Sequence, residues 1–175
     1  MANCSFHCSL MRAVNHTCVY FDMKKKWMYF LYLSIGSFFV SSATILLMQR
    51  VSFAENAEEW QRTLGGILGA LFWLGFIAGF IFQIPITRAR KKDESFKGGK
   101  GISFFSFFSN NTAIVFDVSL MICALLSFVT FAVPTLSQGL AFMSLFGLVF
   151  SIEMHGIFNG KNYEWLNERC RDKRD

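Results

Sequence analysis

The sequence predicts an all-α integral membrane protein with four transmembrane helices, arranged as two antiparallel hairpins with both termini in the cytoplasm. Its 175 residues are 53% hydrophobic and include 22 phenylalanines, which is more apolar surface than a soluble core of this size can bury. Four apolar segments of about 20 residues alternate with polar or basic segments. The chain has room for one domain and none for a separate catalytic domain.

The basic loop 87–101 determines the predicted orientation. It carries six cations, Arg88, Arg90, Lys91, Lys92, Lys97 and Lys100, and short loops rich in Lys and Arg stay in the cytoplasm. Only Arg50 and Arg62 fall on the opposite side. We therefore expect a bacterial cytoplasmic membrane protein whose basic face contacts anionic lipid headgroups. Nucleic-acid binding is the competing interpretation of the net charge of +5, but no aromatic-basic platform or groove-entering helix supports it.

Residues 1–22 are polar and aperiodic, unlike the remaining four-helix domain of residues 23–175. They include possible zinc donors in Cys4, His7, Cys8, His16 and Cys18. Their spacing matches no standard zinc module, so no metal site and no cofactor are expected. The segment is predicted to be a flexible cytoplasmic tail, and the alternative is an extension that precedes a natural start at Met23.

The first two spans are predicted at residues 27–48 and 64–86. The loop between them has apolar residues at helical spacing, which predicts a short amphipathic helix on the outer surface. Pro85 is expected to mark the end of the second span. This span contains two Gly-x-x-x-Gly spacings, which allow close helix packing: Gly65, Gly69, Gly75 and Gly79.

The last two spans are predicted at residues 112–133 and 140–158. An aromatic stretch at 102–108 is expected to lie in the membrane interface, followed by a helix cap at Ser109 or Asn110. The short turn 134–139 would force these spans into a hairpin. The basic tail 159–175 is then expected to lie along the inner leaflet.

Three ionisable residues fall inside these spans, namely Asp117, Glu153 and His155, and all three are predicted near the cytoplasmic end. Residues two apart on a helix point about 200° apart, so Glu153 should face a different neighbour from His155. Stripes of small and polar residues contain Asp117 on the third span and His155 on the fourth. Because such stripes mark helix contacts, we expect Asp117 and His155 to approach each other.

Three functional interpretations follow from this pair. The first is a non-enzymatic accessory or regulatory component, which binds itself or a larger membrane partner while the pair acts as a structural hydrogen bond. The second is an oligomeric transporter or channel with Asp117 and His155 in a cytoplasmic vestibule. The third, remote, is a hydrolase with Ser151 as nucleophile, although no nucleophile elbow is present. Secondary candidate site residues are Glu153, Ser151, Asn110 and Asn111.

Overall fold

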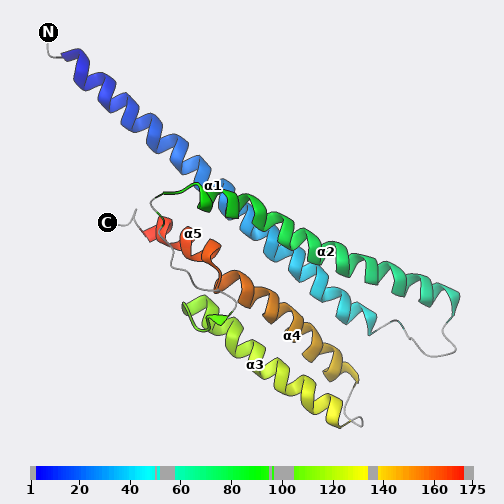
Figure 1. Ribbon diagram of the computed structural model, residues 1–175. Coiled ribbons are helices and arrows are strands. Elements are labelled where there is room, and N and C mark those ends of the chain that lie inside the picture. Colours follow the sequence, from blue (N-terminus) through cyan, green and yellow to red (C-terminus); the bar gives the residue numbers. More distant parts are fainter. Residues whose placement is uncertain are drawn as a thin grey trace.

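The structure, a computed structural model, describes the backbone of residues 3–49, 51, 58–94, 96, 105–133 and 138–171, and side chains from Lys26 to Glu168 within these ranges. This part of the chain is all-helical and contains five helices (Figure 1). They are α1 (Asn3–Met48), α2 (Glu59–Lys91), α3 (Asn111–Ala132), α4 (Gln138–Phe158) and α5 (Lys161–Arg171).

Four of the helices are long and apolar enough to cross a membrane, as the sequence predicts. The candidate spans are Lys26–Met48, Glu59–Lys91, Asn111–Ala132 and Gln138–Phe158, and the shortest has 21 residues. At a rise of 1.5 Å per residue, even that one covers the roughly 30 Å of bilayer hydrocarbon. The expected membrane class of the protein is therefore supported by helix length and composition.

The helices differ from the expected boundaries in four places. Helix α2 begins at Glu59, so residues 59–63 belong to the second span and not to a separate surface helix. Helix α1 begins at Asn3, so residues 3–22 are helical in the segment expected to be an aperiodic tail. Extending an existing helix avoids the cost of nucleation, which explains how polar residues can continue it. That this segment is a flexible tail stays a prediction. The side chains of residues 1–25 lie outside the described part, as do residues 52–57 of the predicted surface helix and 134–137 of the predicted turn.

The other two differences lie at the C-terminal ends of α2 and α4. Helix α2 passes through Pro85 and continues to Lys91, so the expectation that Pro85 marks a helix end is wrong. Proline removes only one backbone donor, and the turns on both sides remain helical. The tail beyond Phe158 forms α5, which the sequence analysis missed and which packs against α2 and α4. Trp165 and Leu166 of α5 are buried in the main hydrophobic cluster.

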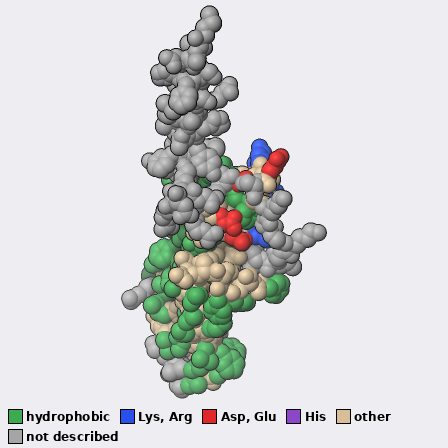
Figure 2. Space-filling model, turned by 90° about the vertical axis from the view of Figure 1, so that its left-hand side faces the viewer, with side chains coloured by type: hydrophobic (Ala, Val, Ile, Leu, Met, Phe, Trp, Pro, Cys, Tyr) green, Lys and Arg blue, Asp and Glu red, His purple; other side chains and the backbone are tan. Residues whose placement is uncertain are grey.

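Helix α1 is the central element of the packing, because α2 and α4 both pack against it, while α3 packs against α4 (Figure 1). The hydrophobic cluster lies at the end of the bundle near α5, which we call the α5 end. Helix α3 is the least enclosed span, with only 6% of its apolar window buried. Figure 2 shows hydrophobic side chains covering much of the lower part of one face, with charged side chains gathered above them.

Glycines bring α1 and α2 close together over part of their contact. A Cβ atom on Gly75 would lie 2.8 Å from the Ser37 carbonyl oxygen, and one on Gly79 would collide with the Phe38 ring. Ser34 Oγ also donates a hydrogen bond of 2.8 Å to the Gly79 carbonyl oxygen. Of the other two predicted packing glycines, Gly65 is buried and Gly69 has open space around its Cβ position. Close approach of α1 is thus shown at the second Gly-x-x-x-Gly pair.

Candidate functional site

The carboxylate of Asp117 lies at the centre of a buried polar cluster between α3 and α4. His155 Nδ1 is 2.6 Å from Asp117 Oδ1, so the structure brings together the two residues that the sequence singles out. Asn159 Nδ2 donates to both carboxylate oxygens, at 3.0 and 3.2 Å. The backbone N–H of Phe108 donates to Oδ2 at 2.7 Å. Asp117 is fully buried and His155 almost so.

The segment before α3 folds over this cluster because of two local features. Asn110 is the N-cap of α3, as the sequence predicts, and its Oδ1 accepts a hydrogen bond of 2.9 Å from the Ala113 N–H. Its Nδ2 donates to the Phe158 carbonyl oxygen and so joins α3 to the end of α4. Phe108 has a φ of 58°, a left-handed conformation that is costly for a bulky residue. That conformation accompanies the hydrogen bond from its amide to Asp117.

The arrangement favours a structural role for the Asp117–His155 pair. A carboxylate has about four acceptor sites, and the described donors contact both oxygens of Asp117. The Phe107 ring covers His155, with ring centroids 4.5 Å apart. Among the described residues, no group of three or more His, Cys, Asp or Glu side chains is placed to hold a metal ion.

The secondary candidates lie in different surroundings. Ser151 Oγ donates to Ser119 Oγ at 3.1 Å, which joins α4 to α3. Asn111 is exposed in the first turn of α3. Asn110 acts as the cap described above. Ser151 and Asn110 thus make packing and capping contacts within the bundle.

Glu153 faces α1, on the opposite side of α4 from the Asp117 cluster. Its Oε2 lies 2.9 Å from Ser42 Oγ, whose single hydroxyl proton is shared with the Phe38 carbonyl oxygen 3.0 Å away. Oε1 is buried and accepts no hydrogen bond from the residues that the structure describes. Ser42 lies 16 residues beyond Lys26, or about 24 Å at 1.5 Å per residue, past the middle of the Lys26–Met48 span. On α4, however, Glu153 is only two residues from His155 and five from the helix end at Phe158, so the expectation that all three ionisable groups lie near the cytoplasmic end stays a prediction. Side chains on a helix point toward its N-terminus, which carries the carboxylate of Glu153 deeper into the bundle.

A groove of about 520 Å³ lies between α2 and α4, with Phe38 of α1 at its floor. Glu153 lines it together with apolar side chains from all three helices. At the α5 end, the wall of the groove is a polar network that the sequence does not predict. Asn162 Nδ2 donates to Gln83 Oε1 at 3.0 Å and to Thr87 Oγ1 at 2.9 Å. Arg90 Nε donates to Asn162 Oδ1 at 3.0 Å.

Two other contributors escaped the sequence analysis, and only one left a readable signal. Asn159 follows His155 by four residues, so the two share a helix face and Asn159 could have been assigned to the same cluster. Ser42 gives no such signal, because its contact with Glu153 joins residues 111 positions apart. No family model, curated protein or solved structure matches the chain.

Proposed function

We propose that the protein is a non-enzymatic accessory or regulatory component of a bacterial cytoplasmic membrane, which acts by packing against itself or a larger membrane partner. One observation carries this proposal. The polar side chains of α3 and α4 that could do chemistry together are engaged in hydrogen bonds within the bundle, above all the carboxylate of Asp117. Such a bundle offers its apolar outer faces, and α3 is the most open of them.

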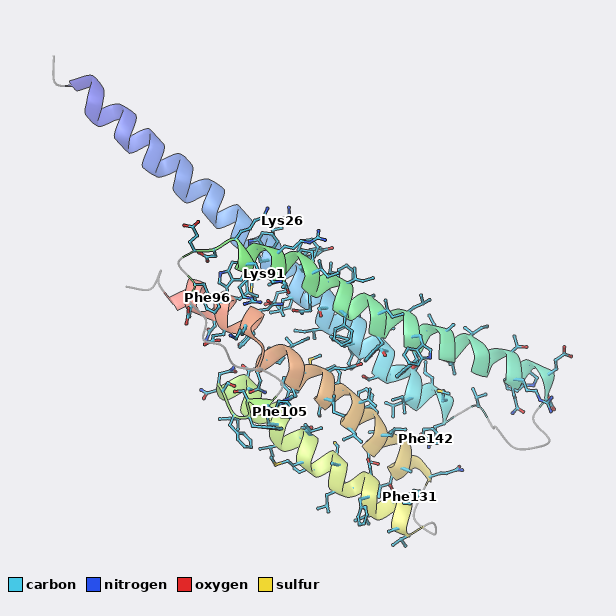
Figure 3. The ribbon with its side chains drawn as sticks, viewed as in Figure 1. Lys26, Lys91, Phe96, Phe105, Phe131 and Phe142 are labelled. Atoms are coloured by element: carbon cyan, nitrogen blue, oxygen red, sulfur yellow. The ribbon has the colours of Figure 1, made fainter. Side chains whose placement is uncertain are left out.

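The proposed topology is two antiparallel hairpins with both termini in the cytoplasm. It is supported by the gathering of cations at the α5 end, where Lys26 and Lys91 lie, whereas Phe131 and Phe142 lie at the opposite end of α3 and α4 (Figure 3). Lys and Arg are retained on the cytoplasmic side during insertion. Anionic headgroups would therefore contact the α5 end.

Cysteine labelling in intact cells tests the topology. In a background with all five native cysteines replaced by serine, Arg62→Cys and Lys92→Cys place single thiols at exposed positions of opposite ends of α2. A membrane-impermeant maleimide is expected to label the thiol at position 62 in intact cells, and that at position 92 only after permeabilisation. Labelling in the reverse order would refute the proposed orientation.

Mass determination of the intact complex, purified in a gentle detergent, tests the mode of action. A stoichiometric complex with a different membrane protein supports an accessory role if the complex is lost when exposed apolar residues of α3 are replaced by serine. Val115 and Leu125 are suitable positions. The same substitutions on α1, at Tyr29 and Tyr32, provide the control because these side chains are also exposed. A monomer with no partner, or binding that survives the α3 substitutions, contradicts the proposal as stated.

The second candidate function is an oligomeric carrier or channel for small solutes or ions. The observation that favours it is Glu153, a buried carboxylate that lines a groove. The Asp117–His155 vestibule expected from the sequence is the other possible pathway. Reconstituted vesicles should then show substrate-dependent flux that Glu153→Gln abolishes. Flux that depends on Asp117 but not on Glu153 would return the pathway to the originally expected pair.

A further inference from the structure

The groove between α2 and α4 contains a chemical group that the proposed accessory role does not use. Glu153 is 7% exposed, and its Oε1 has no hydrogen-bond donor among the described residues. A carboxylate in the interior of a membrane bundle is costly unless it is paired or bound by a proton. Its single described donor, Ser42, satisfies only Oε2. A proton on the carboxyl group, or a cation or hydrogen-bond donor from outside the chain that reaches the buried oxygen, would offset this cost.

We propose that this groove binds a lipophilic organic cation, meaning an apolar body with one positive charge, and that the charge lies against the carboxylate of Glu153. The apolar body would lie among the side chains that line the groove beside Glu153, which are Phe38, Phe76, Phe80, Ile152 and Ile157. This inference goes beyond the proposed function, because it does not depend on a protein partner.

The aromatic wall of the groove suits such a ligand. The rings of Phe38 and Phe80 have centroids 5.1 Å apart, and those of Phe76 and Phe80 lie 5.0 Å apart. Phenylalanine rings attract cations through their faces and bind apolar groups by burial. On the opposite wall, Gly156 has no atom within 4 Å of its Cβ position, so this part of α4 leaves room for the ligand.

Position along the groove separates the carboxylate from the polar network that contains Arg90. Gln83 donates to Ser34 Oγ at 2.9 Å, so the polar network lies at the level of Ser34. Glu153 lies at the level of Ser42, eight residues or about 12 Å farther along α1. A compact cation can therefore contact the carboxylate while it remains apart from Arg90.

An anionic amphiphile with its headgroup on Arg90 is the competing occupant. Arg90 Nε already donates to Asn162, and Asn162 is held in turn by Gln83 and Thr87, so part of the guanidinium is engaged within the bundle. Lys161 also lines the groove and would offer such an anion a second cation. The unsatisfied atom is the acidic one. An anion with an apolar body would also place its chain against the Glu153 carboxylate, without supplying the missing donor.

Two probes of matched shape and opposite charge test the proposal. Tetraphenylphosphonium and tetraphenylborate each carry four phenyl groups, and their binding to the purified full-length protein in lipid nanodiscs can be measured by equilibrium dialysis, with empty nanodiscs subtracted. We expect saturable binding of the phosphonium and weaker binding of the borate. Glu153→Gln should weaken phosphonium binding by at least about tenfold, the effect of losing one charged contact. Glu59→Gln, the same charge change at an exposed position, should have no effect.

Gly156→Leu provides an independent test if Glu153→Gln does not fold. This change keeps the carboxylate and fills the open space on α4, so it should also abolish phosphonium binding. Equal phosphonium affinity in the wild type and Glu153→Gln, wild-type affinity in Gly156→Leu, or stronger binding of the borate would each overturn the proposal. These outcomes leave the partner-binding measurement unaffected, so the two proposals can fail separately.

Discussion

Replacing Asp117 by alanine tests whether the buried polar cluster is structural. The substitution removes an acceptor that serves three donors: His155 Nδ1, Asn159 Nδ2 and the Phe108 N–H, at distances of 2.6–3.2 Å. Hydrogen bonds inside membrane bundles contribute about 0.6 kcal/mol on average and up to about 1.7 kcal/mol each. With three donors left without their acceptor, we expect the free energy of unfolding to fall by about 2–5 kcal/mol.

Reversible unfolding in mixed micelles, followed by circular dichroism as the denaturing detergent is increased, measures this loss. Ser127→Ala is the matched control on the same helix. Its Oγ is buried and has no partner among the described residues, so removing it should leave stability unchanged or slightly raised. If Asp117→Ala unfolds at the wild-type midpoint, or if Ser127→Ala is equally damaging, the cluster does not stabilise the fold in the way inferred here.

Three further predictions concern helix packing. Gly75→Ala should destabilise the protein by about 1–3 kcal/mol because its Cβ would lie 2.8 Å from the backbone of α1. Gly69→Ala, whose Cβ would lie in open space, should be neutral or stabilising. Equal unfolding midpoints for the two variants would contradict this reasoning. Gly147→Ala would place a Cβ 2.5 Å from Cys123 Sγ, so we expect the free energy of unfolding to fall by about 1 kcal/mol. This loss should disappear in a Cys123→Ala background. If the effects of the two substitutions simply add, the contact is not the cause. Trp165→Ala removes a buried ring that donates a hydrogen bond of 2.6 Å to Asp93 Oδ2. Amide hydrogen exchange in α5 should therefore become faster, while exchange in α3 should not change. Unchanged protection of the α5 amides would show that the ring does not hold this helix.

The features that the sequence determines are those with a local physical cause. Hydropathy and length predict four helices able to span a membrane, because each span must satisfy its own backbone hydrogen bonds in lipid. Helical phase separates Glu153 from His155 and puts His155 on the same side as the stripe facing Asp117. The Asn110 cap follows from its side-chain chemistry at a helix start. Each of these depends only on residues within a few turns of one another.

The tertiary structure decides what depends on the offset between helices and on which helices pack together. Hydropathy does not specify the partner of a helix, so the sequence could not predict that Gly75 meets α1 while Gly69 faces open space. It also could not predict a hydrogen bond between Ser42 and Glu153, which are 111 residues apart in the sequence. Likewise, the backbone turn at Phe108 places its amide against Asp117, nine residues farther along the chain, through a contact set by packing. The groove with its unsatisfied carboxylate exists because α2 and α4 both pack on α1, an arrangement that only long-range contacts establish.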